Sequence, residues 1–268
     1  MNSILSAFSY SFITRALVVG TLVSLCASLL GVSLVLKRCS MIGDGLSHVG
    51  FGAIAVAAAL GLSPLKVTIP IVVVSAFVLL KLSGNAKVKG DAAIGVISTG
   101  ALAFGVMVVS LGGVNSDLSS YLFGSILAIN REEAYVSIVL SAIVLAIFCV
   151  LYNAVFAVTF DENFSRAVGV KSDLFDMLIA VLTAITIVLG MRMMGALLIS
   201  ALIILPPLSA MRVFKSFRSV TIASAVISAV CFSAGIMLSY MFDLPAGATV
   251  VIVNILIFAA FSAIGYKK

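Results

Sequence analysis

The single histidine of the chain, His48, lies four residues after Asp44 in a stretch of small or apolar residues. On an α-helix, side chains at positions i and i+4 share one face, with Cβ atoms roughly 5–6 Å apart. A carboxylate and an imidazole therefore point in one direction. Both groups are ligands for zinc and for manganese, and an unperturbed imidazole is mostly neutral at pH 7 and able to bind metal. Asp44 and His48 are our candidate ligands for a divalent metal ion.

Two ligands do not make a closed metal site. A two-fold axis of a homodimer beside this helix would bring together two copies of Asp44 and two of His48, which gives the four ligands that tetrahedral zinc uses. Gly43, Gly45 and Gly50 would allow helices to approach closely there. The alternative is structural: Asp44 shapes the start of the helix and His48 hydrogen-bonds a neighbour.

The composition indicates what kind of protein carries this pair. Of the 268 residues, 63% are hydrophobic and 10% are charged, whereas a soluble domain has about 45–50% apolar and about 25% charged residues. We predict an all-α protein, a polytopic transmembrane helical bundle that forms a single transmembrane domain over residues 1–268. The net charge of +6 does not indicate nucleic-acid binding, because the basic residues lie between apolar runs. We expect no cleaved signal peptide.

The apolar runs are long enough to be membrane spans, which need about 20 residues each. We place them at 12–36, 42–62, 65–82, 92–111, 134–151, 177–191, 193–211, 220–241 and 246–264. This gives about nine spans, with eight as the alternative, because Arg192 alone separates the sixth run from the seventh. Pro206 and Pro207 should break or kink the seventh run. Residues 118–129 are too few to span and predict a short interfacial or re-entrant helix.

The basic residues divide unevenly between alternate loops. All but four of the 16 lie in one set of loops, and the other set holds Arg15, Lys66, Arg131 and Arg192. By the positive-inside rule the richer set is cytoplasmic. The N-terminus is then outside and the C-terminus is cytoplasmic.

One segment of this richer set, at about 159–172, is suited to a partner. Thr159 and Glu162 form a capping box, and Gly169 suits the left-handed position that ends a helix. The predicted helix, 160–168, carries Phe160 and Phe164 on one face. So short a helix is unstable alone, so it must dock into a groove of a soluble partner or pack under its own bundle.

The chain carries no phosphate-binding loop and no nucleophile-and-base set that would support catalysis. We therefore expect a transport subunit and not an enzyme, with any ATP hydrolysed by a separate polypeptide. The methionines of 190–195 (GMRMMG) could ligate soft copper(I), but we interpret them as packing residues.

Three stretches together resemble the membrane permease subunit of bacterial ABC importers for zinc and manganese, a family distantly related to the cobalamin and siderophore permeases. They are LKRCSMIGDGLSH at 36–48, FDENFSRAVG at 160–169 and GALLISALIILP at 195–206. Their order and spacing match over nearly the whole chain. Pro207 departs from the family, which has a small residue such as Ala there.

The resemblance implies a homodimer of permeases in the bacterial inner membrane, bound to two cytoplasmic ABC ATPase subunits. An extracytoplasmic metal-binding protein would deliver the ion, and no cofactor would be bound permanently. Asp44 and His48 match the pathway ligands of the family. The residues that match its ATPase-coupling helix are Asp161, Glu162, Phe164, Arg166 and Gly169.

We therefore predict the permease of an ATP-driven importer of divalent metal ions, zinc first and manganese second, which works by alternating access. One alternative is a permease for a metal chelate or cobalamin, which would not need Asp44 and His48. Another is a proton-coupled secondary metal transporter that uses the same pair without an ATPase. A membrane enzyme is the last alternative, and it lacks a catalytic set.

Overall fold

The computed structural model describes residues 11–83, 90–111 and 131–266, and the regular elements of these ranges are helices. Nine of them are long and apolar enough to cross a membrane, which confirms the prediction of an all-α bundle of nine spans. These are α2 (Ser11–Leu36), α3 (Met41–Ala59), α4 (Pro64–Ser83), α5 (Gly90–Leu111), α7 (Arg131–Val150), α10 (Ser172–Met194), α11 (Ala196–Val213), α12 (Phe217–Phe242) and α13 (Ala246–Tyr266). The short helix predicted at 118–129 lies outside the described residues.

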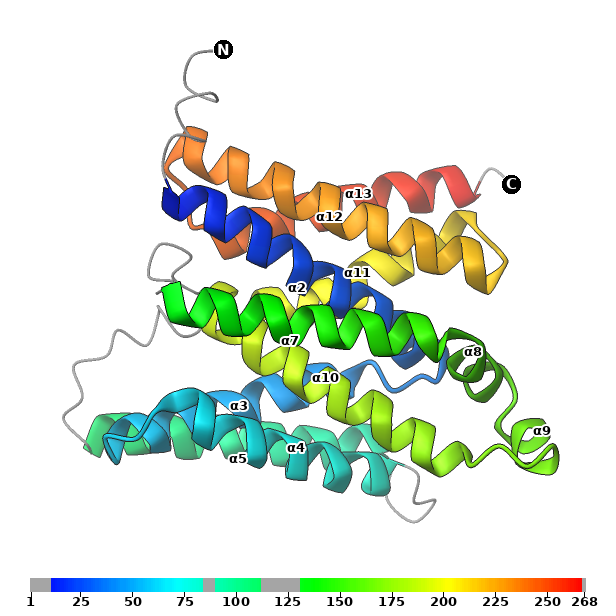
Figure 1. The fold of residues 1–268 in the computed structure, drawn as a ribbon. Coiled ribbons are helices and arrows are strands. Elements are labelled where there is room, and N and C mark those ends of the chain that lie inside the picture. The colour runs from blue at the N-terminus through cyan, green and yellow to red at the C-terminus, as the bar shows by residue number, and fades with distance from the viewer. Residues whose placement is uncertain (1–10, 84–89, 112–130, 267–268) are drawn as a thin grey trace.

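The long helices run back and forth along one direction (Figure 1). Two short helices, α8 (Tyr152–Phe160) and α9 (Glu162–Ala167), lie at one end of this bundle, which we call the α9 end. The α2–α3 turn and the starts of α10 and α12 lie at the same end (Figure 1). Basic residues of the richer set belong to these segments, namely Lys37, Arg38, Arg166, Lys171, Lys215 and Arg218. The alternation of charge seen in the sequence is therefore a separation between the two ends of the bundle.

The helix that carries Asp44 and His48 is the most buried of the nine. Inside the protein, 72% of the apolar stretch of α3 is buried, compared with 17% for α5. α3 contacts α4 and α5, and it also contacts α10 and α11. Residues such as Phe51 and Leu46 on α3 are fully buried in the main hydrophobic core. Any open position on α3 therefore stands out against a packed helix.

The boundary between the sixth and seventh spans differs from the prediction. α10 continues through Arg192 to Met194, and the helix ends at Gly195, whose φ is +88°. The guanidinium of Arg192 forms an ion pair with the carboxylate of Glu133 on α7. This partner compensates the charge, so α10 extends past Arg192 to a glycine that can adopt the left-handed turn. Two separate spans are nevertheless present, as nine spans require.

The prediction for the two prolines was a break or a kink of the seventh span, and the structure shows no break. α11 runs from Ala196 to Val213 with Pro206 and Pro207 inside it. Pro207 has no N–H to donate to the carbonyl of Ile203, four residues earlier. That carbonyl faces Gly31 of α2, where an added Cβ would overlap the oxygen. The close approach of α2 and α11 thus coincides with the carbonyl that lacks its helical donor.

Candidate functional site

The structure brings Asp44 and His48 onto one face of α3, as the spacing predicts. Nε2 of His48 lies 3.6 Å from Oδ2 of Asp44. This distance is longer than a hydrogen bond, so the two atoms are not hydrogen-bonded to each other. The side chain of Asp44 is 39% exposed and that of His48 is 27% exposed. Both groups can therefore offer an oxygen and a nitrogen to a ligand.

These two residues lie on an open strip in the first half of α3, over positions 41–50. Together with Met41, they are the residues of positions 41–50 that are not buried. The remaining positions pack against other helices: Gly43 faces Ile203 of α11, and Gly45 faces Ile94 of α5. A carboxylate and an imidazole placed on the one unpacked strip of a membrane-spanning helix need a polar function.

The second nitrogen of the His48 ring, Nδ1, lacks a hydrogen-bond partner in the described part of the chain. This atom is buried. Buried polar atoms normally have a partner, and metal-binding histidines usually donate their other N–H to one. A bound ion at Nε2 would therefore need a water or another chain at Nδ1.

One turn of helix between the two candidate ligands is fixed by serines. Ser47 Oγ donates to the carbonyl of Asp44 at 2.7 Å, and it lies 3.1 Å from Ser200 Oγ on α11. Both serines are buried. Sequence reasoning missed Ser200, since a lone serine in an apolar run carries no signal of its partner. This contact fixes α11 beside α3 at the level of Asp44 and His48.

The described part of one chain does not complete a metal site. No group of three or more His, Cys, Asp or Glu residues in it could hold an ion. Asp44 and His48 therefore supply two ligands, and a closed site would need further ligands, for example water or residues of a second copy. The methionines near Arg192 are packing residues: Met191 lies against Gly50, and Met194 lies against Gly20.

The predicted coupling segment is helical, but its start is different from the prediction. α8 extends through Thr159 to Phe160, and Asp161 is the N-cap of a separate six-residue helix, α9. The N–H of Phe164 donates to Asp161 Oδ1 at 2.9 Å. Thr159 therefore does not cap the helix, and the predicted continuous helix over 160–168 is two helices joined at an extended Asp161.

The end of α9 follows the prediction. Gly169 has a φ of +90°. The N–H of Val170 donates to the carbonyl of Ser165 at 2.9 Å, and the N–H of Gly169 donates to the carbonyl of Arg166 at 3.1 Å. This is the Schellman arrangement, in which glycine adopts the left-handed conformation without strain.

Apolar side chains on α9 and at its two ends are exposed. Phe164 of α9 is 65% exposed, and Phe160, which ends α8, and Val168, the C-cap of α9, are exposed to a similar degree, whereas Ser165 is buried. The polar side chains of α9 are held by ion pairs: Arg166 contacts Glu162 Oε1 at 2.7 Å and Asp173 Oδ1, on α10, at 2.5 Å. An exposed apolar patch on a short, fixed helix is the kind of surface that binds another protein.

Comparisons with known proteins agree with this architecture. The sequence model of the ABC 3 transport family matches residues 9–265. A probable metal transport system membrane protein of Thermotoga maritima is 32% identical, over 91% of this chain and 86% of that protein. The manganese import system permease protein ScaB of Streptococcus gordonii is 27% identical, over 97% and 93%. The solved structure of PsaBC from Streptococcus pneumoniae in complex with Fab is similar with a TM-score of 0.87 and 26% identity, over 97% and 94%.

Proposed function

The chain belongs to the ABC 3 transport family and is a permease of a metal ABC transporter, and on that premise we propose that it imports divalent ions, manganese first and zinc second. The sequence alone favoured zinc. Oxygen and imidazole ligands suit both metals, so Asp44 and His48 do not choose between them. We place manganese first because several relatives are named for manganese import. Iron is the third candidate.

The observation that carries the proposal is the open strip of α3. Asp44 and His48 are partly exposed, whereas the other residues of positions 42–50 are buried, and Nε2 of His48 lies 3.6 Å from Oδ2 of Asp44. Two ligands from one chain bind an ion weakly, which suits a transient site in a pathway. In a homodimer whose two-fold axis runs beside α3, two such pairs would give four ligands.

The energy for transport would come from a separate ATPase, since the sequence has no phosphate-binding loop. We propose that the coupling segment docks into a groove of this ATPase, with Phe164 of α9 and the exposed part of Phe160, the last residue of α8, as apolar anchors. Asp161 and Gly169 would fix the two ends of the helix, and Glu162 and Arg166 would orient it. Movement of the ATPases on binding ATP would then change which side of the paired bundles is open.

The same proposal orients the protein. The α9 end carries the larger share of basic residues, which favours the cytoplasmic side of a bacterial inner membrane. The N-terminus is then outside and the C-terminus inside. A metal-binding protein would deliver the ion to the opposite end of the bundle, where Glu133 and Arg192 form their ion pair.

The test is uptake of manganese, zinc and iron, offered together, into vesicles that hold the permease with its ATPase and binding protein. His48→Ala and Asp44→Asn should abolish accumulation of the transported metal while the complex still assembles. Normal uptake by both variants would refute the role of these residues and favour a chelate or cobalamin as substrate. Uptake that needs a proton gradient and no ATPase would favour a secondary transporter.

A further inference from the structure

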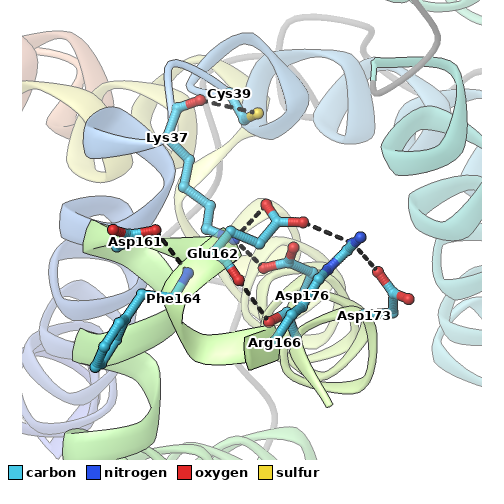
Figure 2. A network of polar contacts seen from close by, with 9 residues as sticks. Lys37, Cys39, Asp161, Glu162, Phe164, Arg166, Asp173 and Asp176 are labelled. Atoms are coloured by element: carbon cyan, nitrogen blue, oxygen red, sulfur yellow. Dashed lines mark hydrogen bonds and ion pairs between the residues drawn. The ribbon is translucent and has the colours of Figure 1, made fainter. Parts of the chain in front are cut away.

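A lysine joins α9 to the turn that precedes α3 (Figure 2). Lys37 is the residue after α2, and its ammonium forms an ion pair with Asp176 on the second turn of α10. Lys37 Nζ also lies 3.9 Å from Glu162 Oε2, on the first residue of α9. The side chain of Lys37 therefore contacts both α9, in the coupling segment, and α10, the helix that follows it.

Burial separates the strong part of this network from the weak part. The side chains of Lys37 and Asp176 are 17% and 16% exposed, whereas Arg166 and Asp173 are well exposed. Exposed ion pairs contribute little to stability, but a partly buried charge that loses its partner is strongly unfavourable. The contact between Lys37 and Asp176 is thus the one that must be kept as the helices move.

The turn that carries Lys37 is stiff. Arg38 has a φ of 58°, a left-handed conformation that glycine usually occupies. The N–H of Cys39 donates to the carbonyl of Leu34 at 2.8 Å, and the N–H of Arg38 donates to that of Val35 at 3.1 Å. A non-glycine residue keeps such a conformation when its surroundings determine it strongly. The turn should therefore move as one body with Lys37.

The same turn continues directly into the helix of the candidate metal ligands. The N–H of Ile42 donates to the carbonyl of Cys39 at 3.0 Å, and the N–H of Gly43 donates to that of Ser40 at 3.2 Å. Asp44 is the next residue. We propose that Lys37 is a positioning residue. It couples the position of α9 to the position of Asp44 and His48, so that a movement of α9 also moves the two candidate ligands. This inference rests on the proposed function.

A cleft beside the network leaves room for such a movement. It has a volume of about 980 Å³, and its lining includes Lys37, Glu162 and Asp176 together with Phe77 and Lys81 of α4. A second route from α9 runs through Arg166 to Asp173 on α10, and α10 in turn contacts α3. The route through Lys37 enters α3 at its start, because the turn that carries Lys37 continues directly into α3.

The experiment measures metal ions imported per ATP hydrolysed, in proteoliposomes with the complete transporter. Lys37→Met and Asp176→Asn should each lower this ratio at least fivefold while the ATPase still binds and hydrolyses ATP. Lys37→Arg should keep the ratio. Exchanging the charges, with Lys37→Asp and Asp176→Lys together, should restore at least half of it. The control is Ser228→Ala, which removes a buried hydrogen bond between α12 and α2 and should leave the ratio unchanged.

The outcomes separate this inference from the function on which it rests. If the wild type imports no metal with its ATPase, the proposed function is wrong. If the wild type imports metal and Lys37→Met and Asp176→Asn keep its ratio, the positioning role alone is wrong. An exchanged pair no better than the single variants would also overturn it. Should Lys37→Met fail to assemble, Asp176→Asn, which keeps the side-chain volume, decides the question.

Discussion

The hydroxyl of Ser47 lies 3.1 Å from that of Ser200, and both serines are buried between α3 and α11. Ser47 is flanked on α3 by Asp44 and His48, so this contact fixes the helix at the level of the candidate ligands. Hydrogen bonds between membrane helices average about 0.6 kcal/mol and reach about 1.7 kcal/mol. A contact of this size can adjust a binding site without deciding the fold.

Replacing Ser200 with Ala should therefore weaken metal binding slightly. We expect the KM for metal uptake to rise about threefold, since 0.6 kcal/mol corresponds to roughly that factor. Ser228→Ala is the matched control, because Ser228 Oγ donates to the Ser24 carbonyl at 2.9 Å between α12 and α2. It should cost similar stability and leave KM unchanged. Equal changes in KM for the two variants would show that the serine on α11 has no special role.

A second prediction concerns the approach of α2 to α11. An Ala at Gly31 would place its Cβ against the Ile203 carbonyl, a backbone atom that cannot turn away. Overpacking of this kind costs about 1–3 kcal/mol. Gly31→Ala should therefore lower the thermal unfolding temperature in detergent. Gly100→Ala on α5, with no atom within 4 Å of the new Cβ, should not lower it, and equal stability of the two variants would contradict the prediction.

A third prediction concerns the outward face of α9. Phe164 is largely exposed, so Phe164→Ser should leave the unfolding temperature of the permease unchanged. If the side chain is an anchor of the interface, its loss costs about 2 kcal/mol or more, which weakens ATPase binding roughly thirtyfold. Titration of the purified ATPase onto the permease in nanodiscs measures this. Asn163→Ala, an exposed polar position on the same helix, is the control and should bind as the wild type does.

The sequence was sufficient for the number of spans and for the pairing of Asp44 with His48. Both follow from local information, namely the length of apolar runs and the geometry of one helix. The end of α10 did not follow, because a charge was taken as the limit of the span. Glu133 on α7 compensates Arg192, and no local feature of the sequence announces that partner.

The predicted start of the coupling helix was wrong for a similar reason. The sequence-based prediction placed the cap at Thr159, whereas the structure has it at Asp161, two residues later. In the structure, the rings of Phe156 and Phe160 pack against Phe217 of α12, with centroids 5.1 and 6.5 Å away. These contacts hold α8 helical through Phe160, which leaves Asp161 to begin the next helix. The contact between Lys37 and Asp176 was likewise invisible, since the two residues meet by tertiary packing.

The cap of α9 gives the last prediction. Asp161→Ala removes the acceptor of the Phe164 N–H, which should cost about 1 kcal/mol. A helix of six residues has no stability to spare, so α9 should fray and ATPase binding should weaken about fivefold. Asp161→Asn keeps an acceptor oxygen and should bind almost as the wild type does. Thr159→Ala should also leave binding unchanged, because Thr159 lies inside α8. If Thr159→Ala weakens binding and Asp161→Ala does not, the cap is at Thr159, and α9 begins two residues earlier in the complex.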